Sequence, residues 1–372
     1  MERRRLLALV GGLSAGLAGC TRQGSGGGDS PTPGSGQPDL PVPESDLVRG
    51  APRDAIPAIT DPVFGTDWSG VKAEARGPTG QAYTTRPRLS DDSPVVGVER
   101  DGEARAYPLA VLNWHEAVND EFGGPLLVTY CPLCGSAVVA ERTVAGDPVV
   151  FGVSGLLYRQ DLVLYDRPTD SLWSQLLATA IRGPRTGDRL SLVPSSLTTW
   201  GAWREAHPDS RVLRPPPESD TVAGRVTRNY GTDPYVGYRN TEDVGVSDEA
   251  FGDDRLHPKT RVLGVEREGT ARAYPRPAVV EAGVVEDRVG DLPVVVTAGP
   301  DGTLAAYDRR VDGRVLSFAP AQDGTLRAGG SRWDRLTGRA LEGPLESERL
   351  APVGKVLFWF AWLEFHPESE LW

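Results

Sequence analysis

Two segments of this 372-residue chain occur twice in the same order, and this repetition limits the folds available to it. Residues 96–108 match residues 263–275 at most positions, at an offset of 263 minus 96, or 167 residues. Residues 200–208 match residues 359–367 in the same way. One such match could arise by chance, but two in register indicate an internal duplication.

Each half contains similar short elements. In the first half, alternating apolar residues on both sides of Asp101-Gly102 predict a β-hairpin. Pro108 fits the first turn of a helix expected to reach about Val118, and Ser196 fits the N-cap of a helix that ends at His207. Further strands are predicted over residues 125–130, 136–142, 148–153, 162–165 and 189–193. The predicted fold class is α+β and β-rich: two tandem pseudo-repeats of a short-stranded β unit, with one or two helices each.

The sequence is predicted to divide into four parts. These are a signal peptide with a lipobox (1–20), a flexible tether (21–52), a first repeat with the cysteine site (53–214) and a second, degenerate repeat (215–372). The tether prediction follows from composition, since residues 21–45 are mostly Gly, Ser, Pro and other small or polar types, and such a segment buries no core.

The N-terminus has the features of an export signal. Three arginines, Arg3 to Arg5, precede a short apolar stretch that is too short to span a bilayer. The arginines fit twin-arginine export as well as general secretion. Cys20 ends a lipobox-like Leu17-Ala18-Gly19-Cys20 and is the predicted lipidation site. We therefore expect an extracytoplasmic protein that is attached to the cell membrane through lipid only.

The charge of the chain excludes one class of partner. A net charge of −11 argues against nucleic-acid binding, which requires a basic surface. Lysine is scarce: Lys72, Lys259 and Lys355 are the only ones among 40 basic residues. An acidic excess with so little lysine suggests an organism that lives at high salt, with codon bias as the plainer explanation.

Cys131 and Cys134 are the two cysteines left in the chain once Cys20 is lipidated, and they form a Cys-Pro-Leu-Cys-Gly motif. Two thiols at this spacing can close a disulfide or hold one soft metal ion. A possible third group is His115, on the helix predicted after Pro108.

The first interpretation is a metal site at the tip of a hairpin. A closed structural zinc site needs four ligands, and the chain offers no further cysteine. With His115 as third ligand the site would be Cys2His, with a fourth position open or filled by a carboxylate or water. Zinc or copper would suit such a site. The protein would then be a metal- or ligand-binding lipoprotein without catalytic activity.

The second interpretation is a redox dithiol in a possible thiol oxidoreductase, without a cofactor. A nearby His115 would lower a thiol pKa and make Cys131 or Cys134 reactive. The redox partner, or a small ligand in its place, is not identified by the sequence. A purely structural disulfide ranks third, because so short a loop gives little entropic stabilisation.

The duplication serves as an internal comparison for this site. At the positions of the two cysteines the second half has Ala298 and Asp301, and at the position of His115 it has Ala282. The site is therefore assigned to the first half. His207 and His366 occupy matching positions in both halves, which favours a structural role, and Asp166 or Gln175 could reach the thiols.

Several of these motifs together resemble one family, known as domain of unknown function 3179. The resemblance is carried by residues 102–120, 129–135, 151–158, 171–175 and 197–203. It implies an exported or lipid-anchored protein. It also implies thiol redox chemistry, or redox-linked handling of a soft metal, because some members have selenocysteine in the motif that matches Cys131 to Cys134. No catalytic residue is carried over from the family.

Overall fold

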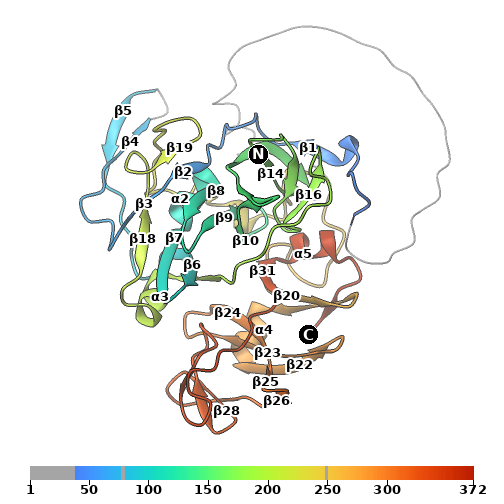
Figure 1. Cartoon of the computed structure of the whole chain (residues 1–372). Helices are drawn as coiled ribbons and strands as arrows, with labels where there is room; N and C mark the ends of the chain where they lie inside the picture. Colours follow the sequence, from blue (N-terminus) through green and yellow to red (C-terminus); the bar gives the residue numbers. More distant parts are fainter. Residues whose placement is uncertain (1–37, 77–79, 248–249) are drawn as a thin grey trace, which may run out of the picture.

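Short β-strands are the main regular element of the fold (Figure 1). Their sheets are arranged as a six-bladed β-propeller. The computed structural model describes residues 38–76, 80–247 and 250–372. Strands account for 42% and helices for 10% of the structure, with four helices in the part of the chain that is described. Six sheets of three to five strands form the blades, and three two-stranded ribbons accompany them.

The first half of the chain supplies three five-stranded sheets. In spatial order, the strands of the first sheet are β17 (Ser196–Thr199), β6 (Pro94–Arg100), β7 (Glu103–Pro108), β18 (Arg211–Arg214) and β3 (Val63–Gly65). Those of the second sheet are β10 (Ser136–Glu141), β9 (Pro125–Cys131), β8 (Ala117–Glu121), β2 (Ile59–Asp61) and β19 (Asp220–Thr221). Those of the third sheet are β1 (Leu47–Arg49), β13 (Phe151–Tyr158), β14 (Asp161–Asp166), β15 (Leu172–Ser174) and β16 (Thr179–Arg182). The helices of this half are α2 (Leu109–His115) and α3 (Trp200–Ala206).

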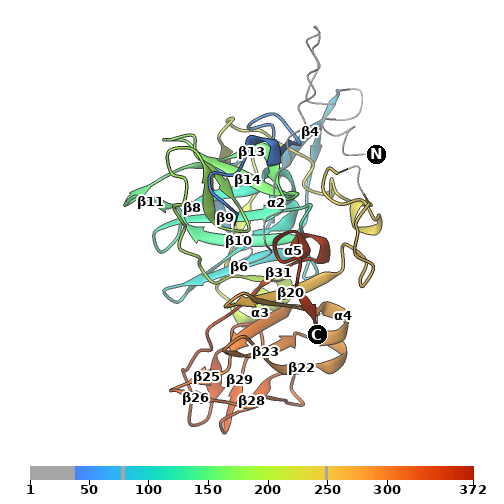
Figure 2. The same ribbon diagram turned by 90° about the vertical axis from the view of Figure 1, so that its right-hand side faces the viewer.

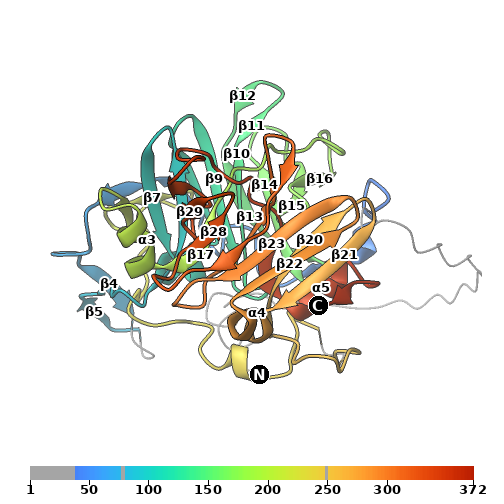
Figure 3. The same ribbon diagram turned by 90° about the horizontal axis from the view of Figure 1, so that it is seen from below.

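The second half supplies three smaller sheets in the same chain order (Figure 2). The strands of the first of these sheets are β31 (Lys355–Phe358), β20 (Arg261–Arg267), β21 (Thr270–Pro275) and β32 (Glu370–Leu371). Those of the second are β22 (Val284–Val289), β23 (Leu292–Ala298) and β24 (Leu304–Asp308). Those of the third are β27 (Ala319–Pro320), β28 (Leu326–Ala328), β29 (Ser331–Trp333) and β30 (Ala340–Glu342). The helices are α4 (Arg276–Ala282), beside β22 and β23 in Figure 3, and α5 (Trp359–Phe365).

The predicted fold class, two tandem pseudo-repeat α+β units, is wrong. The four helices have seven residues each, too short to form a layer against a sheet, and each half is divided into three blades. The core also crosses the boundary between the halves. One buried cluster joins Cys131 and Phe151 of the first half to Val262 and Trp359 of the second. The halves therefore do not fold as separate units, because neither closes this core alone.

The repeated sequence landmarks nevertheless have equivalent surroundings. A Cβ atom added at Gly97 would lie 2.3 Å from the Trp203 ring, and one added at Gly264 would lie 2.3 Å from the Trp362 ring. In both halves a strand glycine therefore makes room for the indole of a later helix. This shared contact explains why glycine and tryptophan recur at these positions.

The predicted local elements differ from the structure mainly at their ends, but the strand predicted over residues 189–193 is wrong, since Arg189 and Leu192 form only isolated bridges. The hairpin around Asp101-Gly102 is confirmed as β6 and β7, and both turn residues have positive φ. The helix after Pro108 stops at His115 rather than Val118, because Glu116 adopts a left-handed φ of 57°. Ser196 starts strand β17 instead of capping a helix, and Thr199 is the N-cap of α3.

The end of the segment predicted as a tether contacts the folded body. Val42 is fully buried and its N–H donates to the Ile181 carbonyl, at 2.9 Å. Strand β1 adds to the edge of β13. The predicted signal peptide, Cys20 and most of the tether lie outside the described residues.

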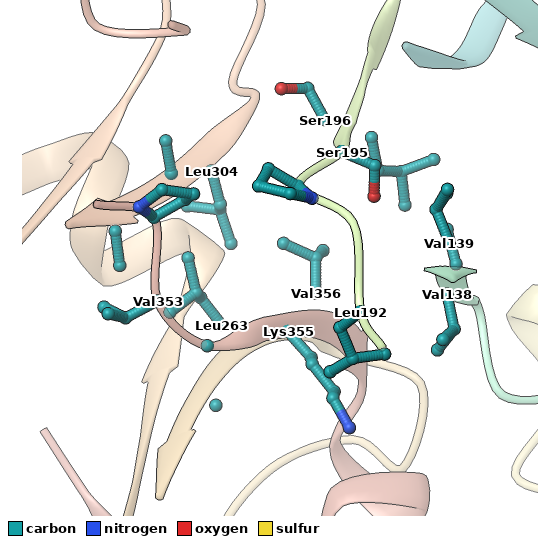
Figure 4. Close-up of a pocket in the computed structure, with 18 of the residues that line it drawn as sticks. Val138, Val139, Leu192, Ser195, Ser196, Leu263, Leu304, Val353, Lys355 and Val356 are labelled. Atoms are coloured by element: carbon teal, nitrogen blue, oxygen red, sulfur yellow. The ribbon is translucent and has the colours of Figure 1, made fainter. Parts of the chain in front are cut away.

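A cavity of about 1090 Å³ lies between the halves. Residues of β6, β10 and β17 line it from the first half, and residues of β20, β24 and β31 line it from the second. Figure 4 shows a largely aliphatic wall, with the ammonium of Lys355 near Leu192. At this cavity β31 lies next to β10, the strand that follows the cysteine motif.

Candidate functional site

The cysteine motif forms the tight end of the β9–β10 hairpin. Cys131 is the last residue of β9 and pairs with Ser136, the first residue of β10. Gly135 has a φ of 62°, and a Cβ there would lie 2.9 Å from the Phe358 ring, so both conformation and space require glycine. The Cys134 N–H lies 3.4 Å from Cys131 Sγ, which directs that sulfur inward. The hairpin therefore holds two thiols on its inner side.

Both thiols are free and buried. The exposed fractions of Cys131 and Cys134 are 2% and 0%. Burial in an apolar core raises the pKa of Cys134 well above that of an ordinary thiol, and the neighbouring Cys131 thiol raises it further. Without a cation the Cys134 thiol is therefore protonated at neutral pH, and a bound metal ion would be needed to stabilise its thiolate.

Asp161 completes the site from a different hairpin. A two-residue turn, Arg159-Gln160, joins β13 to β14, and both turn residues have positive φ, 48° and 60°. This turn places Asp161 at the start of β14, opposite Tyr158. One ligand atom from each of Cys131, Cys134 and Asp161 lies within 4.8 Å of the other two.

One oxygen of the Asp161 carboxylate is left without a protein partner. Oδ2 accepts the Leu176 N–H at 2.9 Å, whereas Oδ1 is buried and has no hydrogen-bond partner among the described residues. Burial raises the pKa of Asp161 to about 7. A buried carboxylate oxygen without a donor is costly unless a proton or cation occupies it. Asp161 Oδ1 is therefore an atom that a proton or a cation could occupy.

The second half of the chain covers the motif. The Phe358 N–H of β31 donates to the Cys134 carbonyl at 2.7 Å. The Tyr238 hydroxyl, in the connector between the halves, lies 3.3 Å from the Leu133 carbonyl. These contacts fix the loop from both sides and separate the sulfurs from bulk solvent.

His115 does not belong to this group of ligand atoms. Its Nδ1 lies 2.7 Å from the Pro57 carbonyl and its Nε2 lies 2.8 Å from the Tyr230 hydroxyl. Because a carbonyl only accepts, Nδ1 carries the proton and Nε2 accepts from the tyrosine. Burial lowers the pKa of His115 to about 4. The imidazole is therefore a neutral internal link, and both of its nitrogens are occupied.

Asp166 and Gln175, the two other candidates, form hydrogen bonds with residues around the site. Asp166 accepts the Trp173 Nε1–H at 2.9 Å and closes a turn with Thr169. Gln175 accepts the Ser136 hydroxyl at 3.0 Å, directly after the cysteine motif. His207 and His366 stack on Trp203 and Trp362 in equivalent places.

Two residues of the site were missed from the sequence, Asp161 and Lys355. The Lys355 ammonium donates to the Leu176 carbonyl, and the Leu176 N–H donates to Asp161 Oδ2. One signal could have revealed Asp161: it is an acidic residue directly before the apolar run from Leu162 to Tyr165. Lys355 has the weaker signal of being one of only three lysines.

Fold and site together define a six-bladed β-propeller with a buried Cys-x-x-Cys site completed by an aspartate. The chain belongs to the family described as "Protein of unknown function (DUF3179)", whose model matches residues 53–369. No curated protein and no solved structure matches the chain. Within the described part, no helix is both long and apolar enough to cross a membrane.

Proposed function

We propose that this protein is an extracytoplasmic, lipid-anchored lipoprotein that binds a soft divalent metal ion, best represented by zinc, at Cys131, Cys134 and Asp161. The observation that carries the proposal is the convergence of the two sulfurs and a carboxylate oxygen of Asp161, a buried residue whose Oδ1 has no hydrogen-bond partner among the described residues. Thiolate sulfur and carboxylate oxygen are both common zinc ligands.

The spacing of the donors fits such an ion. Two thiolates bound to one tetrahedral zinc lie about 3.8 Å apart when each Zn–S bond is about 2.3 Å. The three donor atoms are within 4.8 Å of one another without a metal, so a small contraction would complete the arrangement. Three protein ligands leave a fourth position for water or a small ligand, as in zinc sites that are not closed.

Metal analysis of the purified mature protein tests this proposal. We expect about one equivalent of zinc, lost in Cys131→Ser and in Asp161→Ala. His115→Gln serves as the control, because His115 lies outside the group and its substitution should leave the metal content unchanged. A zinc-free protein that fails to bind added Zn²⁺ would overturn the proposal, and loss of metal in His115→Gln would restore the Cys2His interpretation.

Thiol redox is the second candidate, and the free, adjacent sulfurs favour it. In this reaction the two thiols reduce a disulfide substrate: one S–S bond forms within the motif, the substrate's S–S bond breaks, and both protons pass to the substrate sulfurs. Asp161, beside Cys134, could accept and return one of those protons. The burial of both sulfurs places this candidate second, because a macromolecular disulfide must reach a thiol to exchange with it. A count of two reactive thiols only after reduction would favour it.

A further inference from the structure

The second half lacks the cysteine motif, yet it contributes a charged side chain beside the site. Lys355 begins β31, the strand whose Phe358 holds the Cys134 carbonyl. Its ammonium donates to the Leu176 carbonyl, and the Leu176 N–H donates to Asp161 Oδ2. A single residue, Leu176, therefore links the ammonium to the carboxylate.

The charge of a metal-bound site explains why a cation is needed there. A divalent ion with two thiolates and one carboxylate carries one surplus negative charge. In a buried environment such a surplus is costly unless a counter-charge lies nearby. With one ammonium added, the group is electrically neutral.

Among the acidic groups near Lys355, the Asp161 carboxylate is the one that is buried with it. Asp161 and Glu266 are the acidic groups that act on the ammonium, and Glu266 is solvent-exposed, which weakens its effect by screening. Burial lowers the pKa of Lys355, while the Asp161 carboxylate counteracts that shift. The buried Asp161 carboxylate is therefore the main acidic partner of the Lys355 ammonium.

We infer that Lys355 is a positioning residue of the thiol site, whose ammonium neutralises the surplus charge that Asp161 brings to a bound divalent ion. The inference rests on the proposed metal-binding function and deepens it, since metal binding then requires both halves of the chain. The second half therefore supplies the counter-charge of the site as well as the strand that covers the cysteine motif.

Lys259 provides a matched control. It is also a lysine of the second half near the motif, with its Nζ 2.6 Å from the Thr241 carbonyl and 3.8 Å from the centre of the Tyr238 ring. The acidic group that acts on it is Asp243 rather than Asp161. Removing its charge should therefore disturb the neighbourhood without changing the charge balance of the site.

The experiment is a double-mutant cycle on the full mature protein, with Zn²⁺ affinity measured by competition with a chromophoric chelator. Lys355→Gln keeps a donor for the Leu176 carbonyl but removes the charge, and should weaken Zn²⁺ binding about tenfold. Lys355→Arg should stay within about threefold, and Lys259→Gln should match the wild type. In an Asp161→Asn background, which keeps a ligand oxygen but removes its charge, Lys355→Gln should change the affinity by less than about twofold.

The outcomes separate this inference from the function on which it rests. Equal losses from Lys355→Gln with and without Asp161 would show that Lys355 acts only through the structure, and would overturn the inference alone. A wild-type protein that binds no Zn²⁺ would overturn the proposed function and the inference with it. Should Lys355→Gln fail to fold, Lys355→Met, which keeps the aliphatic stem, replaces it in the cycle, with the same outcomes deciding.

Discussion

Protonation of His115 should contribute to the way in which the stability of this protein depends on pH. The imidazole is fully buried between the Pro57 carbonyl and the Tyr230 hydroxyl. Burial, with a smaller effect from Arg228, lowers its pKa from 6.5 to about 4 in the folded state. The unfolded chain therefore binds a proton below pH 6.5 while the folded chain stays neutral down to about pH 4. Stability is fully present above pH 6.5 and is lost as the pH falls towards 4.

The size of the effect follows from the pKa difference. A lowering of about 2.5 units corresponds to about 3 kcal/mol in total, since each unit is about 1.4 kcal/mol. Between pH 7 and pH 4.5 the share attributable to His115 is about 2 kcal/mol of unfolding free energy.

Urea-induced unfolding at pH 7 and pH 4.5 measures this share when the wild type is compared with His115→Gln. The variant loses hydrogen bonds and should be less stable than the wild type at pH 7. Its loss on acidification should be smaller by about 2 kcal/mol, because glutamine does not titrate. The carboxylates and the other histidines contribute equally to both proteins and cancel in the difference. The same pH dependence in both proteins would refute the assignment of a buried neutral imidazole.

Three further predictions concern other parts of the chain. Gly97→Ala should destabilise the protein by about 1–3 kcal/mol in thermal or urea unfolding, because the added methyl group would meet the Trp203 ring at 2.3 Å. Cys20→Ser should give an exported protein that no longer partitions with membranes, and a variant that stays membrane-bound would contradict the lipid anchor. Cys131 and Cys134 should react slowly with a thiol reagent in the metal-free native protein and rapidly after unfolding, since their exposed fractions are 2% and 0%.

The local elements could be predicted from the sequence because their signals are local. The Asp101-Gly102 turn and the glycine of the cysteine motif depend on backbone conformations that few residues adopt, and the residue types reveal them. The six blades have no such signal. Their closure depends on packing between distant segments, which puts Cys131 and Trp359 in one buried cluster, and the spacing of the repeat does not specify that packing.

The site was predicted only in part, for a related reason. The two thiols are only three residues apart in the sequence, which predicts that they lie close together. Asp161 lies on another hairpin, and its turn uses Arg159 and Gln160 at positive φ, where Gly or Asn would have given a recognisable signal. His115 was the more visible candidate because it is missing from the second half, but this difference reflects its buried hydrogen bonds to Pro57 and Tyr230.

The missing cysteines and histidine of the second half led to the prediction that the site belongs to the first half. In the structure each half contacts the other at matching places. Phe358 of β31 binds the Cys134 carbonyl, and Thr199, its counterpart on β17, donates to Asp301, the counterpart of Cys134. The two contacts involve equivalent positions, but the first is between backbone atoms and the second is between side chains. A duplicated chain whose halves contact each other in this way can lose the thiols from one copy while that copy stays essential, since its strand still covers the loop of the other. The second half is therefore expected to retain β31 even where its own loop has no ligands, and Lys355 on that strand is the residue through which the metal site would depend on it.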